Sequence, residues 1–292
     1  MDWLPIVRIA LALIILSMAS YSDWRTRMAS DMYWVAMGGA GLALLASYII
    51  TAGIDPLYLL FLIPIGWFFL DMLWDREDVQ GPLRFLPMVM YVASLATTAF
   101  IVYLFWGQSF FWELVSIPVM FVIYYLLYIV DIIKGGANAK ALMALSLLVP
   151  MYPVIGPFPL VALPSELSQY VMPFSLLTLF YGALLTLAIP LVFLVRNLRS
   201  GDRRFPTMLF GVKMDLADAK KKFVWPMEYV EDGELRISNM PRGPESLDEH
   251  YAMLEAQGLV RIWVTPKIPM IIPLTAGVAV AAIVGNLMFI LF

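Results

Sequence analysis

Residues 32–52 read MYWVAMGGAGLALLASYIITA, a run without a single charged side chain. As an α-helix, this run is long enough to cross the roughly 30 Å hydrocarbon core of a membrane. The composition of the whole chain agrees with that interpretation. Only 14% of its 292 residues are charged and 62% are hydrophobic, whereas a soluble domain averages about a quarter charged residues. The sequence therefore predicts a polytopic membrane protein and excludes an ordinary cytosolic domain or a disordered chain.

Seven further apolar stretches predict an all-α bundle of about seven to eight transmembrane helices. The stretch at 139–163 is unusual because prolines crowd its second half, so only about 139–149 is expected to form a regular helix. The first stretch lacks a basic amino-terminal region, so we expect it to be retained. The expected crossings lie near 4–22, 32–52, 56–74, 85–106, 112–133, 139–163, 172–196 and 268–291.

The basic residues predict how this bundle is oriented. We assume that the amino terminus lies outside and that the chain crosses the membrane eight times. In this topology, 18 of the 19 Lys and Arg residues lie on or beside the cytoplasmic side, and Arg8 is the exception. The opposite connections near 53–55, 107–111 and 164–171 contain no Lys or Arg. Because cytoplasmic loops of membrane proteins carry the excess of basic residues, we expect a multi-pass protein of the cell membrane with this orientation.

A change in composition divides the chain. We predict a membrane bundle at 1–199, a small cytosolic α+β module at 200–266 and a carboxy-terminal transmembrane helix at 267–292. Asp232-Gly233 is a turn signal, and we expect strands at 222–225 and 235–237 to form a hairpin around it.

The module is also expected to contain a helix and a third strand. Ser246 is the expected helix cap, Gly258 the expected helix end, and residues 259–264 the expected strand. The run Lys220–Lys222 is interpreted as a solvated turn, with contact to anionic lipid as the alternative.

Rare residue types exclude several kinds of chemistry. The chain has no cysteine and one histidine, His250, which excludes a disulfide framework, a thiolate metal site and a serine–histidine triad. The net charge is −3, so no basic footprint indicates a nucleic acid partner. We expect no metal and no cofactor, and membrane lipid as a partner.

Two polar clusters lie at the expected cytosolic ends of crossings. Residues 20–27 read SYSDWRTR and residues 134–142 read KGGANAKAL. Taken alone, Asp23 is an interfacial acid that pairs with Arg27, and Asn138 caps a helix after a short turn. Taken together, an acid that faces a glycine-flanked polar residue at the same depth is the arrangement of a membrane aspartic peptidase, in which two carboxyl groups share a proton and activate one water.

The same stretches resemble motifs of a known family. Residues 22–27, SDWRTR, resemble the first aspartate motif of the type IV prepilin and archaeal preflagellin (prearchaellin) peptidases, which are GxGD-class membrane aspartic proteases. Residues 135–142, GGANAKAL, resemble their second motif, Gly-Gly-Ala-Asp-Ala-Lys, and 263–269, WVTPKIP, resembles archaeal members. The resemblance implies catalytic roles for Asp23 and position 138. It also implies substrate binding by Gly135, Gly136, Ala137 and Lys140.

One departure from the family motif concerns the chemistry directly. Position 138 is Asn where the family has Asp, and an amide cannot ionise or pass a proton. The resemblance therefore predicts that this chain is nearly inactive. Two explanations are open, an engineered Asp→Asn substitution and a natural pseudo-enzyme, and we favour the first because the flanking motif is intact.

The resemblance implies that the parent enzyme cuts the basic leader of prepilin or prearchaellin precursors at the cytosolic membrane face. The acids Asp75, Glu77 and Asp78 are expected to attract that leader. Two alternatives are an ion-coupled transporter or channel that uses Asp71 and Asp131, and a non-catalytic binder of pilin helices. Asp131 is interpreted as an ion-pair partner of Lys134, with a role as substitute catalytic acid as the alternative.

Overall fold

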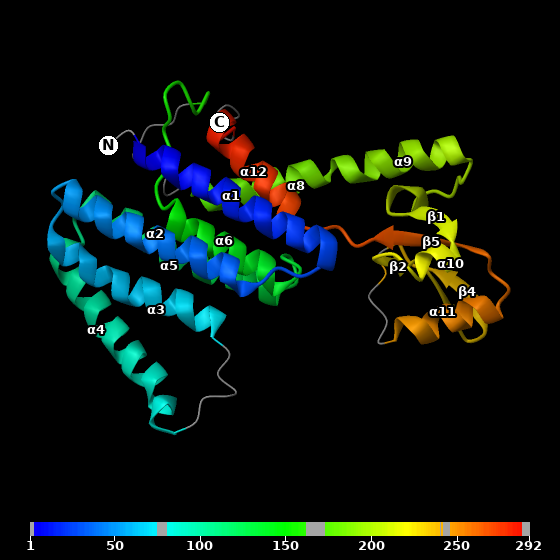
Figure 1. Cartoon of the computed structure of the whole chain (residues 1–292), viewed down its shortest axis with the longest axis horizontal. Helices are drawn as coiled ribbons and strands as arrows, with labels where there is room; N and C mark the ends of the chain where they lie inside the picture. The colour runs from blue at the N-terminus through cyan, green and yellow to red at the C-terminus, as the bar shows by residue number, and fades with distance from the viewer. Residues whose placement is uncertain (1–2, 75–80, 162–172, 240, 242–245, 288–292) are drawn as a thin grey trace. The chain divides into compact units, whose positions relative to one another are not determined.

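The computed structural model describes residues 3–74, 81–161, 173–239, 241 and 246–287. By packing, the chain divides into two compact units, which Figure 1 draws in one view. The first consists of Met1–Ala183 with Pro269–Phe292, and the described part of it is mostly helical. The second, Leu184–Ile268, contains the strands of the described chain.

The first unit confirms the predicted helical bundle. Six helical segments of the described chain are long and apolar enough to cross a membrane, and α6 and α12 are shorter apolar helices. The helices are α1 (Trp3–Thr26), α2 (Asp31–Thr51), α3 (Leu62–Leu73), α4 (Leu86–Phe105), α5 (Ser109–Ile129), α6 (Gly136–Leu148), α8 (Phe174–Thr186) and α12 (Ile271–Val284). Short 3₁₀ helices, η1 (Pro56–Phe61) and η2 (Gly81–Phe85), precede α3 and α4.

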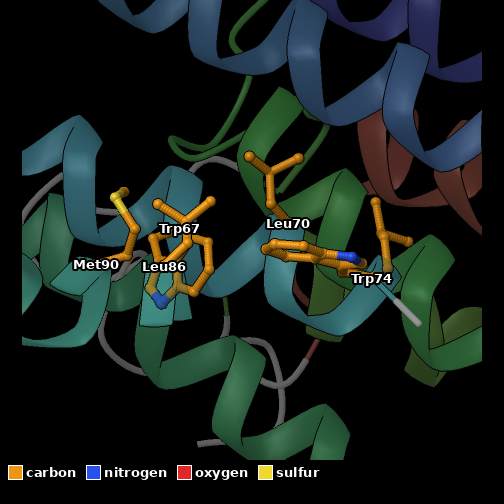
Figure 2. A pocket seen from close by; sticks show the side chains of 6 residues that line it. Trp67, Leu70, Trp74, Leu86 and Met90 are labelled. Carbon is orange, nitrogen blue, oxygen red and sulfur yellow. The ribbon is translucent and has the colours of Figure 1, made fainter. Parts of the chain in front are cut away.

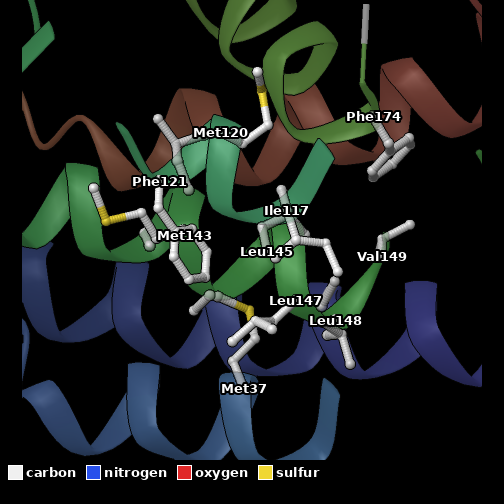
Figure 3. Close-up of a cluster of buried hydrophobic side chains, with 14 of the residues drawn as sticks. Met37, Ile117, Met120, Phe121, Met143, Leu145, Leu147, Leu148, Val149 and Phe174 are labelled. Atoms are coloured by element: carbon white, nitrogen blue, oxygen red, sulfur yellow. The ribbon is translucent and has the colours of Figure 1, made fainter. Parts of the chain in front are cut away.

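Helix α6 forms the centre of this unit. Its side chains from Asn138 to Leu148 are buried, apart from the partly exposed Lys140. A helix that is apolar all round is stable only when neighbours cover every side, and α2 and α5 pack against it. Figure 3 shows the resulting core around α6, which includes Met37, Ile117, Phe121, Met143, Leu147 and Phe174.

The chain beyond α6 is not helical, as the prolines predicted. Helix α6 ends at Leu148, two residues before Pro150. Ile155 and Phe158 then exchange backbone hydrogen bonds in a tight turn, and the amide of Leu160 donates to the carbonyl of Ile283 at 2.9 Å. These bonds attach the segment to the end of α12 and satisfy backbone groups that a helix no longer pairs.

The crossing expected at 172–196 differs from the prediction. Helix α8 ends at Thr186, and a second helix, α9 (Ala188–Ser200), continues to Ser200 after a turn at Leu187. Pro190 explains the break, because it has no N–H to donate to the carbonyl of Thr186. Together the two helices form a 27-residue apolar segment.

The second unit is an α+β module, as predicted. Its three-stranded antiparallel sheet has the order β1-β5-β2, and β3 pairs with β4 in a separate hairpin. The core includes Val212, Val224, Leu254, Ile262 and Val264. The elements after α9 are η3 (Thr207–Leu209), β1 (Val212–Asp215), α10 (Leu216–Ala219), β2 (Val224–Pro226), β3 (Glu228–Glu231), β4 (Glu234–Ile237), α11 (Leu247–Ala256) and β5 (Arg261–Pro266).

The turn and the helix of the module were predicted correctly, but one strand partner was not. Asp232 and Gly233 both have positive φ, 56° and 78°, as a two-residue hairpin turn requires. The prediction that 222–225 enters this hairpin was wrong, because such a tight turn must be entered by the residues directly before it, Glu228–Glu231. Ser246 caps α11 by accepting a hydrogen bond from the amide of Glu249.

Candidate active site

Asp23 lies in the last turn of α1, where the helix reaches the expected cytosolic face. Its side chain is half-buried, and its carboxyl group interacts with Arg27 and with the backbone amide of Ile271 at the start of α12. One turn earlier, the Ser20 hydroxyl lies 2.8 Å from the Thr275 hydroxyl. Two polar contacts therefore hold the end of α1 against the beginning of α12.

Asn138 occupies the first turn of α6. Gly135 precedes the helix with φ of 86°, a conformation that glycine adopts without steric cost. The Asn138 side chain is 9% exposed, and its Nδ2 atom donates to the carbonyl of Lys134 at 2.6 Å. The glycine turn thus orients the amide back over the end of the preceding loop.

An ion pair joins this turn to α2. Lys140 Nζ lies 2.6 Å from Asp31 Oδ2, although the two residues are 109 positions apart. Asp31 begins α2, and only four residues separate it from the end of α1 at Thr26. Asp23 and Asn138 therefore lie at the same end of the bundle, and Figure 1 shows α1 and α2 joined there by a short connection.

Asp31 was not among the residues singled out from the sequence. Its local signal is that of a helix start, because Ser30 accepts a hydrogen bond from the amide of Met32 and an acid follows at once. Only the packing of α2 on α6 shows that Lys140 is its partner.

The remaining motif residues cluster on the same turn. Gly135 is exposed, whereas Gly136 and Ala137 are partly buried. A Cβ atom at Gly136 would lie 3.9 Å from the Tyr128 hydroxyl, an ordinary contact distance. The structure thus brings Gly135, Gly136, Ala137, Asn138 and Lys140 together with Asp31, at the end of the bundle that also holds Asp23.

The other acids considered from the sequence have different surroundings. Asp131 is exposed in the turn after α5, and in the described chain it forms no ion pair with Lys134, so that part of the prediction was wrong. Asp71 accepts a hydrogen bond from the hydroxyl of Tyr91. Asp75, Glu77 and Asp78 lie outside the described residues.

A separate apolar pocket of about 470 Å³ lies between α3 and α4. Figure 2 shows the two tryptophans and the aliphatic side chains that surround it. None of the predicted site residues lines it, and its lining carries no acid or base. It can accommodate hydrocarbon but offers no group for acid–base chemistry. The lining residues are Trp67, Leu70, Leu73, Trp74, Leu86 and Met90.

The end of the bundle with Asp23 and Asn138 offers one carboxyl group and one amide. The carboxylate of Asp23 can accept a proton from water, and the amide of Asn138 can donate or accept a hydrogen bond. An amide cannot share a proton with a carboxylate. The pair as it stands can orient a water or a peptide carbonyl, and it lacks the second ionisable group of a proton-sharing dyad.

Comparisons with known proteins agree in the kind of protein they indicate. A family model described as the carboxy-terminal region of archaeal peptidase A24, type II, matches residues 203–287. The preflagellin peptidase of Methanococcus voltae is 26% identical over 175 residues, which cover 58% of this chain and 70% of the relative. The preflagellin peptidase of Methanococcus maripaludis is 29% identical with the same coverage, and that of Methanocaldococcus jannaschii is 24% identical over 52% of this chain and 63% of its own length.

Proposed function

We infer, from the similarity of this chain to archaeal preflagellin peptidases, that it is built as a membrane aspartic endopeptidase for the basic leaders of prearchaellin-type precursors. Asp23 and the side chain at position 138 are the two groups of its active site. The observation that carries this proposal is the ion pair between Asp31 and Lys140, at 2.6 Å, which holds the start of α6 beside the start of α2. Because only four residues separate α1 from α2, the same contact brings both motifs to one end of the bundle.

The chemistry of such a site requires two carboxyl groups in different protonation states. One carboxylate takes a proton from water while the water oxygen attacks the scissile carbonyl carbon. The other, protonated carboxyl group donates a hydrogen bond to the carbonyl oxygen. A proton then passes to the leaving amide nitrogen and the C–N bond breaks.

We assign the acid to position 138 and the base to Asp23. In this chain the Nδ2 atom of Asn138 donates to the Lys134 carbonyl at 2.6 Å. A carboxyl group could make this bond only when protonated, which supports a protonated group at position 138 before substrate binds. Because that group has a single proton, the proton must leave the Lys134 carbonyl for the substrate carbonyl oxygen when it acts as the acid.

With Asn at position 138, this chain is expected to bind substrate and cut it hardly at all. The amide can still form hydrogen bonds with a peptide carbonyl, so binding survives the loss of proton transfer. For the chain with Asn at position 138, this favours a second candidate function, the non-catalytic binding of pilin-like helices. Ion-coupled transport is less well supported, because Asp71 lies in the last turn of α3 and Asp131 in the turn after α5, and neither lies at the middle of a crossing.

The proposed cleavage site faces the cytoplasm. The support for this orientation is the distribution of basic residues, 18 of 19 of which fall on one side of the predicted topology. A precursor with a basic leader and a following hydrophobic helix would enter the membrane with its leader at this face. The scissile bond would then lie at the depth of Asp23.

The test is a cleavage assay in detergent or liposomes with a precursor that has a basic leader before a hydrophobic helix. Asn138→Asp should raise the cleavage rate at least about 100-fold, the usual contribution of a general acid or base. Asp23→Asn in the Asn138→Asp background should abolish the gain. Asp131→Asn in that background is the matched control and should leave the gain intact.

The controls separate the candidate functions. A folded Asn138→Asp protein that does not cut would contradict the trapped-peptidase proposal, and precursor binding by the unchanged chain would then leave the binder. Loss of activity on Asp131→Asn together with retention on Asp23→Asn would overturn the assignment of the base.

A further inference from the structure

Four arginines surround the end of α9 in the second unit. Arg196 and Arg199 are exposed on successive turns of the helix, and Arg203 and Arg204 are exposed in the segment that follows. Gly201, with φ of 78°, ends the helix between the two pairs. We refer to these four residues as the juxtamembrane patch.

None of the four arginines of the juxtamembrane patch forms an ion pair within the described part of the chain. Arg204 interacts at longer range with Glu228. The one acid in the segment, Asp202, is engaged by Arg261 at 3.2 Å. Arg196, Arg199 and Arg203 therefore present guanidinium groups that are free to bind an anion.

The neighbouring basic run has a different environment. Lys220 pairs with Glu255 at 2.8 Å, and Lys222 pairs with Asp218 at 3.7 Å. Two of its three charges are thus matched locally, which agrees with the solvated turn predicted for Lys220–Lys222. It offers a control region of three basic residues in the same unit, with a weaker expected attraction for anions.

An apolar surface leads directly to the juxtamembrane patch. Leu191, Val195 and Leu198 are exposed and lie on one face of α9 by their helical spacing. The opposite side of the helix is fixed to the module, because Asn197 is buried and its Nδ2 atom donates to the carbonyls of Met208 at 2.9 Å and Gly211 at 2.7 Å. The helix cannot turn its apolar face inward without breaking these two bonds.

The order of residues along α9 matches the boundary of a membrane. Its exposed apolar residues come before its arginines, as at the end of a crossing where the chain leaves the hydrocarbon core. Phe205, 79% exposed, follows the patch, and exposed aromatic residues favour the membrane interface.

From these features we propose that the juxtamembrane patch binds the phosphate of an anionic lipid headgroup, with an acyl chain of that lipid along Leu191, Val195 and Leu198. Guanidinium groups form paired hydrogen bonds with phosphate oxygens. A free phosphate matches the arginines alone, whereas a lipid also covers the apolar face. The continuous apolar and basic surface therefore favours lipid over free phosphate.

Native mass spectrometry of the full-length protein in detergent tests this proposal. Phosphatidylglycerol is the anionic probe, and phosphatidylcholine and inorganic phosphate are the comparison probes. The test variant is Arg196→Gln/Arg199→Gln/Arg203→Gln. The control variant, Lys220→Gln/Lys221→Gln/Lys222→Gln, removes the same charge from the same unit.

We expect the unchanged protein to bind phosphatidylglycerol more tightly than phosphatidylcholine. The arginine variant should lose on the order of a hundredfold in affinity, at about fivefold for each basic residue. The lysine variant should lose less than about fivefold. Phe205→Ser should weaken phosphatidylglycerol binding and leave any phosphate binding unchanged, because a phenyl ring contacts the lipid and not the anion.

Three results would overturn the proposal. Equal losses in the arginine and lysine variants would indicate attraction by net charge without a site. Displacement of phosphatidylglycerol by inorganic phosphate at equal concentration would indicate a phosphate site. Equal affinity for the two lipids would exclude recognition of the headgroup. Thermal unfolding of each variant verifies its fold, and Arg199→Gln alone replaces the triple variant if that variant unfolds.

Discussion

Lys140 Nζ lies 2.6 Å from Asp31 Oδ2, so the second sequence motif is attached to the amino-terminal end of α2. Both side chains are partly exposed, at 26% and 46%. This contact gives Lys140 a structural role besides the substrate binding that the sequence resemblance implies. The contact therefore ties the beginning of α6 to the beginning of α2.

The first prediction concerns the strength of this ion pair. A double-mutant cycle with Asp31→Asn and Lys140→Met should give a coupling energy of about 0.5–1 kcal/mol, because partly exposed ion pairs are screened by solvent. The measurement is reversible unfolding in mixed micelles. A coupling energy of zero would show that the contact does not stabilise the protein.

A charge reversal distinguishes the two roles of Lys140. In the Asn138→Asp background, Lys140→Asp should reduce cleavage, and Asp31→Lys/Lys140→Asp should restore much of it if the pair positions α6. If Lys140 instead contacts the substrate, the reversed pair should restore stability but not activity. The cleavage assay and the unfolding measurement on the same variants separate these outcomes.

The second prediction concerns the close approach of α2 and α6. A Cβ atom at Gly41 would lie 2.6 Å from the carbonyl carbon of Leu147 and 2.7 Å from the amide nitrogen of Leu148, both backbone atoms of α6. Gly41→Ala should therefore separate the helices and cost about 1–3 kcal/mol. A Cβ atom at Gly39 would meet nothing within 4 Å. Gly39→Ala should change stability by less than about 1 kcal/mol, and equal effects of the two substitutions would contradict this packing.

Most of the helical bundle could be predicted because the membrane imposes a length and a polarity on each crossing. The end of α6 before Pro150 also followed from the sequence, since proline removes a donor. The pairing of β2 with β5 could not be predicted. It joins Val224–Pro226 to Thr265 and its neighbours across forty residues, and local turn signals carry no information on such a contact.

In the candidate site, too, local features could be predicted from the sequence and long-range contacts could not. Asp23 and the 135–140 motif could be identified from residue type and resemblance, because their chemistry is local. Asp31 could not, since its role depends on Lys140 at a distance of 109 residues in the chain. Glycine spacing indicates that helices approach closely, but only the structure shows that Gly41 faces the backbone of α6.

The third prediction concerns a chain of hydrogen bonds in the bundle core. The Tyr124 hydroxyl donates to Ser175 Oγ at 2.7 Å, Ser175 lies 2.8 Å from Ser146 Oγ, and Ser146 donates to the Leu142 carbonyl. Ser175 must then donate to Ser146, which makes it the central link between α5, α6 and α8. All three side chains are buried.

Ser175→Ala should cost more than Tyr124→Phe. It removes the acceptor at 2.7 Å from the buried Tyr124 hydroxyl and leaves it only the more distant Ser146, at about 1–3 kcal/mol, whereas Tyr124→Phe removes one interhelical bond worth about 0.6 kcal/mol. Unfolding in mixed micelles measures both variants. The reverse order of costs would show that the hydroxyl of Tyr124 finds another partner.

The fourth prediction concerns the pH dependence of the second unit. The Glu228 side chain is buried, and Glu228 Oε2 accepts a hydrogen bond from the backbone amide of Trp263 at 3.3 Å. Burial raises the pKa of Glu228, although the Trp263 amide, Lys213 and Arg204 act in the opposite direction. The folded state therefore binds the Glu228 proton more tightly than the unfolded state does.

The sign of the effect follows from this raised pKa. Below the pKa of a glutamate in the unfolded chain, about 4.3, the contribution of Glu228 to stability is fully present. It is lost as pH rises through the pKa of Glu228 in the folded protein. The slope of this loss is at most about 1.4 kcal/mol per pH unit. Native-state hydrogen exchange of the β5 amides in the full-length protein, corrected for intrinsic rates, should show this loss. Glu228→Gln should flatten it, because glutamine does not titrate. The control is Glu231→Gln, at an exposed position of the β3–β4 hairpin, which should retain the slope. If the slope persists in Glu228→Gln, the pH dependence belongs to another titratable group.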